Sequence, residues 1–92
     1  MSWTTKEWLA LYENHEIRVV NTWFSGAKLY IDGDCRDTNT GYVAMSTARP
    51  VLSGTVQASD GQRHRVEVYV TALLTTKAKI CVNGRQVGGD IF

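Results

Sequence analysis

The sequence predicts an all-β fold, an antiparallel β-sandwich of about seven short strands, with a small barrel as the alternative. Three observations predict it: apolar residues alternate along several short runs, turn sequences separate these runs, and no helical pattern lies between them. Alternation with a period of two is typical of a strand with one buried face. At 92 residues, the chain is long enough for a single domain, 1–92, with one core.

The clearest strands lie in two stretches that resemble each other, residues 15–33 and 64–84. Each opens with a histidine and alternating apolar residues, continues after a short break with a lysine-led apolar run, and ends in Asp-Gly or Asn-Gly. These dipeptides are strong hairpin signals, because a type I′ turn needs positive φ at both central residues. The likeness predicts an internal duplication and a tight turn at the end of each stretch.

A short helix is predicted before the first strand, from about Thr5 to Glu13. Thr4 has the position of an N-cap, and Glu7 follows three residues later as in a capping box. Apolar residues then recur at helical spacing: Trp8, Leu11 and Tyr12. Because an isolated helix of this length is marginal in water, we expect it to dock on the sheet.

The other elements follow from β-forming residues and turn signals. Gly54 lies within the predicted strand at 51–58 and indicates a bulge or a close approach of the backbone. The glycines at 88–89 are expected to release the C-terminal tail from the sheet. Turns are predicted at 38–41 and 59–62 from their Asn, Asp and Gly content. Strands are expected at 16–23, 27–32, 51–58, 63–72, 77–82 and 85–87, with a stub at 35–37 and a weaker strand at 42–48.

Composition and charge exclude several classes of protein. The net charge of +1 gives no long-range field for nucleic acid or anionic lipid. No apolar run is long enough to cross a membrane, and the N-terminus does not read as a signal peptide. We therefore expect a cytoplasmic protein whose two cysteines, Cys35 and Cys81, are reduced.

Some segments resemble a known family. The run H-x-I-x-V-x-N-x-x-x-S-G that begins at His15, its continuation through residues 30–33, and the later ICVNG at 80–84 are similar to segments of the Fas apoptotic inhibitory molecule domain. That domain is a small antiparallel β-sandwich. The resemblance implies a non-enzymatic interaction or protective domain, and it carries no functional residue over to this chain.

We predict no catalytic residue, metal ligand or cofactor. His15, His64, Cys35 and Cys81 offer the right atoms for zinc, but no pair has the short spacing that structural sites use. The acidic run at 32–39 lacks the glycine and the final glutamate of a calcium loop, so its aspartates are expected to form turns. A small hydrolase or thiol enzyme that uses Cys35 or Cys81 is kept as an alternative.

Two surfaces are candidates for ligand binding. Trp23 and Phe24 are adjacent in a strand and so point to opposite faces; one of them either packs under the helix or forms an exposed aromatic platform, with Tyr30 also facing outward. Arg63 and Arg65 flank a histidine and, with Lys77, Lys79 and Arg85 on neighbouring strands, could form a basic patch suited to phosphates.

From these residues we expect a small non-catalytic binding or protein-interaction domain. Its partner is expected to be another protein or a second copy of the chain, and neither nucleic acid nor membrane is indicated. A carbohydrate-binding module that uses the aromatic residues is the second alternative. The candidate ligand-binding residues are Trp23, Phe24, Tyr30, Arg63 and Arg65.

Overall fold

The computed structural model describes residues 5–22, 26–39, 49–71 and 76–91, which form two four-stranded antiparallel sheets. The first sheet holds β1 (Thr5–Tyr12), β2 (His15–Thr22), β3 (Gly26–Ile31) and β4 (Asp34–Asn39), in that order. The second holds β5 (Leu52–Gln57), β6 (Arg63–Thr71), β7 (Lys77–Val82) and β8 (Arg85–Gly89). The all-β, antiparallel prediction is confirmed.

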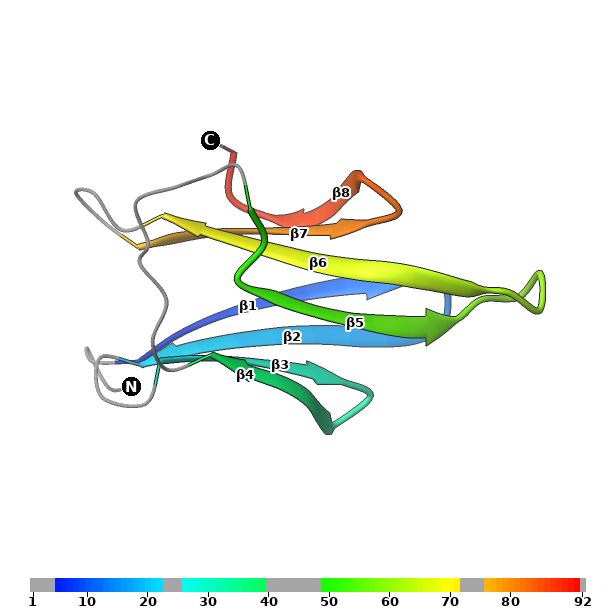
Figure 1. Ribbon diagram of the computed structural model, residues 1–92, viewed down its shortest axis with the longest axis horizontal. Coiled ribbons are helices and arrows are strands. Elements are labelled where there is room, and N and C mark those ends of the chain that lie inside the picture. Colours follow the sequence, from blue (N-terminus) through cyan, green and yellow to red (C-terminus); the bar gives the residue numbers. More distant parts are fainter. Residues whose placement is uncertain (1–4, 23–25, 40–48, 72–75, 92) are drawn as a thin grey trace.

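The two sheets face each other as two layers (Figure 1), with β1 in contact with β8 and β4 in contact with β5. Among the described strands, no pairing joins one sheet to the other, so they do not close into a barrel. One core fills the space between them and draws on alternate residues of both sheets. Its fully buried larger members are Ile17, Val19, Leu29, Ile31, Leu52, Val66, Val68, Val70 and Ile80.

The predicted N-terminal helix from Thr5 to Glu13 is wrong, because this segment forms β1. β1 pairs with β2 along its whole length, from Thr5 opposite Thr22 to Tyr12 opposite His15. Only Glu13 and Asn14 connect the two strands. Among the described residues there is no helix of the length and apolarity that crossing a bilayer requires.

The residues that suggested a helix also fit a strand. Trp8 and Ala10 are buried, whereas Leu9 and Leu11 are exposed, so the burial alternates with a period of two. The Trp8 indole donates to Asp90 Oδ2 at 2.9 Å, beyond the end of β8. Pairing with β2 and this long-range bond therefore override the local capping signals.

Three further expectations need correction at the ends of strands. The stub at 35–37 is part of the longer β4, so Thr38 and Asn39 are strand residues and not a turn. Gly88 and Gly89 belong to β8 and do not free the tail. A side chain at Gly88 would place its Cβ only 2.5 Å from the Ala10 Cβ, so glycine permits β8 to lie against β1. The weaker strand at 42–48 lies outside the described residues.

The two similar stretches form matching hairpins. Asp32 N donates to Glu16 O at 2.8 Å, and Asn83 N donates to Arg65 O at the same distance. The side chains of Asp32 and Asn83 each accept a bond of 2.9 Å from the N–H of the same partner. Both turns have positive φ at the Asp or Asn and at the Gly that follows, as the turn prediction requires. That the likeness arose by duplication stays a prediction.

Candidate functional site

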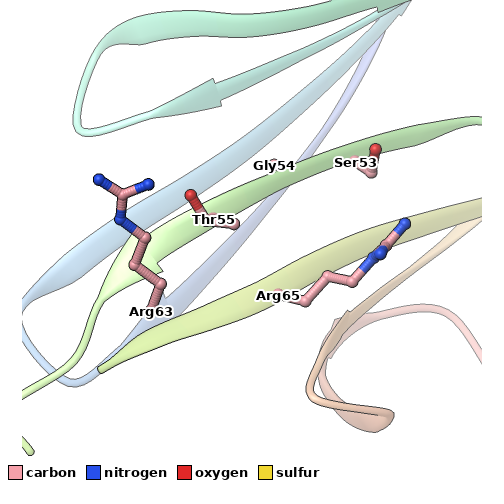
Figure 2. Close-up of a pocket in the computed structure, with 5 residues that line it drawn as sticks. All are labelled: Ser53, Gly54, Thr55, Arg63 and Arg65. Carbon is pink, nitrogen blue, oxygen red and sulfur yellow. The ribbon is translucent and has the colours of Figure 1, made fainter.

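A hollow on the outer face of the second sheet brings together two of the predicted ligand-binding residues. Ser53, Gly54 and Thr55 of β5 and Arg63 and Arg65 of β6 line this space of about 440 Å³, which we call the arginine hollow (Figure 2). The strand register places Thr55 directly opposite Arg65 and explains why their side chains share one face.

The alternation of β5 and β6 puts these polar side chains outside. In β6, Val66 and Val68 are buried in the core, so Arg63 and Arg65 point away from it. In β5, Gly54 faces the first sheet, where an added Cβ would lie 3.3 Å from Ile31 Cδ1. A glycine here allows β5 to approach the core closely while the hydroxyls on either side of it face solvent.

The two arginines differ in their surroundings. Arg65 Nε lies 3.5 Å from Glu67 Oε2, and the Arg65 side chain is 65% exposed. An exposed ion pair of this kind is weak, so a ligand anion can replace it. Arg63 forms no ion pair with another described residue. Figure 2 shows the two side chains on opposite sides of Thr55 with their guanidinium groups pointing apart.

This arrangement suits separate anionic groups on an extended ligand. A guanidinium binds carboxylate or phosphate through two parallel N–H donors, and the Ser53 and Thr55 hydroxyls can donate or accept beside it. Small-molecule sites, by contrast, are enclosed and mostly apolar. The arginine hollow can therefore hold acidic side chains that a protein surface presents.

The structure separates Tyr30, a third predicted site residue, from the arginine hollow. Tyr30 lies on the other sheet, where the Arg18 guanidinium carbon is 5.0 Å from the centre of its ring. Lys79 lies over Tyr69 at 5.2 Å, so the predicted wider basic patch is partly engaged with an aromatic ring. Trp23 and Phe24 lie outside the described residues, and the aromatic platform stays a prediction.

The cysteines are on different sheets. Cys35 is exposed in β4 and Cys81 is buried in β7, and both are free thiols. Burial raises the pKa of the Cys81 thiol, which disfavours the reactive thiolate. Among the described residues no three His, Cys, Asp or Glu side chains cluster as metal ligands would. No observation on this part of the chain favours the thiol-enzyme alternative.

Both histidines lie where the two sheets meet at one end. The His15 Nε2 donates to Gln57 O at 2.6 Å, and its Nδ1 lies 2.7 Å from Asp32 Oδ2. Since both partners are acceptors, the protonated ring with two N–H groups satisfies both. The hydrogen bond to Asp32 and then the bond to Gln57 raise the pKa of His15. His64 Nδ1 lies 2.7 Å from the Tyr12 hydroxyl, so this histidine also connects the two sheets.

Sequence reasoning missed Ser53 and Thr55, although a signal for them was present. The turn predicted at 59–62 fixes which residues face each other on the flanking strands. Ala58 N donates to Gln62 O at 2.8 Å, and the register continues from Gln57 opposite Arg63. Counting back from the turn would have placed Thr55 opposite Arg65.

Comparisons with protein-family models, curated proteins and solved structures find no match for this chain. The resemblance to the Fas apoptotic inhibitory molecule domain therefore stays a prediction.

Proposed function

We propose that this chain is a small protein-interaction domain that binds an acidic segment of a partner protein at the arginine hollow. The observation that supports it is the placement of Arg63 and Arg65 on one exposed face beside two hydroxyl groups, with their guanidinium groups directed to separate points. Arginine is enriched in protein interfaces and among the residues that contribute most to binding.

An acidic protein segment fits this surface better than nucleic acid does. The chain carries a net charge of only +1, and Glu67 borders the arginine hollow beside Arg65. A phosphate backbone presents a dense row of negative charge and needs many cationic contacts. Two arginines with an acidic neighbour instead select a few well-placed carboxylates, and Glu67 disfavours ligands with charge at every position.

Fluorescence anisotropy with a dye-labelled decapeptide of alternating glutamate and serine tests the proposal at low ionic strength. Alternate residues of an extended peptide point to one side, so its glutamates can meet both arginines. We expect binding by the natural chain and an affinity about tenfold lower for Arg63→Gln or Arg65→Gln, since a bond to a charged group contributes about 1.5 kcal/mol. Added salt should weaken binding.

The matched control is Arg85→Gln, which removes the same charge from β8, with β7 between it and β6. This variant should bind the peptide like the natural chain. Equal losses in all three variants would show attraction to net charge alone and contradict a defined site. The absence of binding by the natural chain at micromolar concentration, or equal binding of a glutamine-for-glutamate peptide, would also contradict it.

A further inference from the structure

The edge strand β1 exposes apolar side chains. Leu9 is 57% exposed and Leu11 is 72% exposed, and only Ile91 joins them among the large exposed hydrophobic residues that the structure describes. Both leucines lie on the outer face of the first sheet, opposite Arg18 and Glu16 of β2. Exposed leucines on an edge strand mark a place where another strand can pair.

On the side away from β2, no described strand hydrogen-bonds to β1, although β8 packs against its inner face near Ala10. Asp32 N donates to Glu16 O, so even-numbered residues of β2 direct their backbone groups to β3 and odd-numbered ones to β1. The β1–β2 register then turns the N–H and C=O groups of Thr5, Glu7, Leu9 and Leu11 away from β2. No side chain of the described residues hydrogen-bonds to the main chain of Glu7, Leu9 or Leu11.

The edge strand β5, by contrast, is covered by side chains of the first sheet. Asp37 Oδ2 accepts from Ser53 N at 2.9 Å, and the His15 ring donates to Gln57 O at 2.6 Å. Beyond the strand, Glu13 accepts from Ser59 N at 2.7 Å. These bonds occupy backbone groups that a foreign strand would need.

The other two edges are protected in different ways. β8 has five residues and a register shift, and the Gln86 amide donates to Gly88 O at 3.1 Å. β4 also has a register shift, and it carries Asp34, Arg36 and Asp37. Bulges and charges are the devices that keep edges from pairing. β1 also carries charged residues, Lys6 and Glu7, but its eight residues pair with β2 without a register shift, and Leu9 and Leu11 are uncharged.

We propose that β1 is a self-association edge at which two copies of the chain pair antiparallel about a two-fold axis. The two first sheets then form one continuous sheet with four strands from each copy. The proposal rests on β1 alone and not on the arginine hollow.

Charge and shape select one register for this pairing. When the two-fold axis passes through Leu9, the two Leu9 residues lie opposite each other, and Leu11 of each copy lies opposite Glu7 of the other. No like charges are then opposite each other. A shift by one residue in each copy, with Leu9 opposite Leu11, would place Glu7 opposite Glu13, which is unfavourable. The opposite shift would place Leu9 opposite Glu7 and separate the leucines.

A second copy is the occupant that these features favour. In the selected register the leucines of both copies become neighbours on one face, and on the other face Trp8 lies opposite the small Ala10. The net charge of +1 per chain gives two copies almost no repulsion. An edge that complements itself forms a closed, isologous contact.

Light scattering across a micromolar concentration series tests the proposal on the full chain. The natural chain should reach twice the mass of the 10.3 kDa monomer, whereas Leu9→Lys should stay at the monomer mass with an unchanged circular dichroism spectrum. Ile91→Lys is the matched control, because it makes the same change at an 88% exposed residue outside β1, and it should stay dimeric. A monomeric natural chain, or a dimeric Leu9→Lys variant, would overturn the proposal.

A cysteine cross-link tests the register independently of the lysine substitution. In a Cys35→Ser background, Leu9→Cys should form a disulfide-linked dimer on mild oxidation, because residues opposite each other lie about 5.5 Å apart at Cα. Leu11→Cys should not, because its two copies would be four residues apart along the strands, about 13 Å. Cross-linking of Leu11→Cys and not of Leu9→Cys would contradict the register, and cross-linking of neither would contradict the edge.

Discussion

The His15 side chain connects the two sheets, and its protonation state affects this connection. Its ring joins Asp32 in the first sheet to the carbonyl of Gln57 in the second, and those two bonds raise its pKa above the ordinary value of 6.5. The folded chain holds this proton more tightly than the unfolded chain. The contribution of His15 to the free energy of unfolding is therefore fully present below about pH 6.5 and is lost as pH rises through the raised pKa. The bond from His15 lowers the pKa of Asp32 below 3.8, so its contribution is lost only in stronger acid.

The variant Asp32→Asn should reduce the pH dependence of stability while it keeps the turn. Asn83 occupies the matching position of the second hairpin and accepts the same 2.9 Å bond from the backbone, so an asparagine fits at residue 32. Urea unfolding should show that the natural chain is more stable at pH 5.5 than at pH 8.5, with a smaller difference in the variant. Asp34→Asn, an equal charge change on an exposed neighbour, should behave like the natural chain; an unchanged difference in Asp32→Asn would contradict this role of His15.

Gly88 should not tolerate a side chain. An added Cβ would lie 2.5 Å from the Ala10 Cβ and 3.3 Å from the Ala10 Cα, and part of that obstacle is backbone. We expect Gly88→Ala to lower the free energy of unfolding by about 1–3 kcal/mol in urea titrations. Gly54→Ala should lose less, because its nearest neighbour is the flexible end of Ile31 at 3.3 Å.

A double variant separates this contact from a general effect of the substitution. Ala10→Gly removes the methyl group that Gly88→Ala would meet, so the double variant should lose less stability than the sum of the two single losses. Losses that simply add would contradict direct contact between β1 and β8 at this point.

At the scale of elements, local pattern was sufficient for the strands of the two similar hairpins and not for the edges. β2, β3, β6 and β7 alternate clearly, and the Asp-Gly and Asn-Gly turns mark where β3 and β7 end, so short-range information determines them. β1 was mistaken for a helix because its strand state depends on pairing with β2. Asn39 and Gly88 were assigned to a turn and a tail because contacts with other strands, which a local window does not contain, hold them in place.

The bond from Ser53 N to Asp37, which covers the edge of β5, should contribute to both stability and solubility. Asp37→Ala removes the acceptor of Ser53 N and should lower stability by about 1 kcal/mol, a typical contribution of a hydrogen bond. The uncovered edge should also increase aggregation of the chain, measured by light scattering after incubation at high concentration. Asp34→Ala is the control on the same strand. Equal stability and solubility of the two variants would contradict a protective role for Asp37.

At the scale of the whole molecule, polar bonds join the two sheets on both sides of the core. Trp8 bonds to Asp90 on the β1 and β8 side, and Asp37 bonds to Ser53 on the β4 and β5 side. The proposed dimer edge and the arginine hollow thus lie on opposite sides of the chain, because β1 faces β8 and the hollow adjoins β5. A dimer would leave both hollows open, and two linked sites bind a repeated acidic segment more tightly than one.

Part of the candidate site could be predicted at this scale. Arg63 and Arg65 follow from the alternation of one strand, so the sequence was enough to place them on an outer face. Ser53 and Thr55 join them through the β5–β6 register, and the separation of Tyr30 depends on its assignment to the other sheet. Sheet membership is a long-range property, and residue spacing along the chain does not reveal it.

The most direct test of the proposed function is a nitrogen–proton NMR titration of the natural chain with the glutamate–serine peptide. We expect the amide signals of Ser53, Thr55, Arg63 and Arg65 to shift with peptide concentration, while those of β3 on the other sheet stay in place. Shifts centred on β3 or β1, or no shifts at millimolar peptide, would contradict the arginine hollow as the binding site.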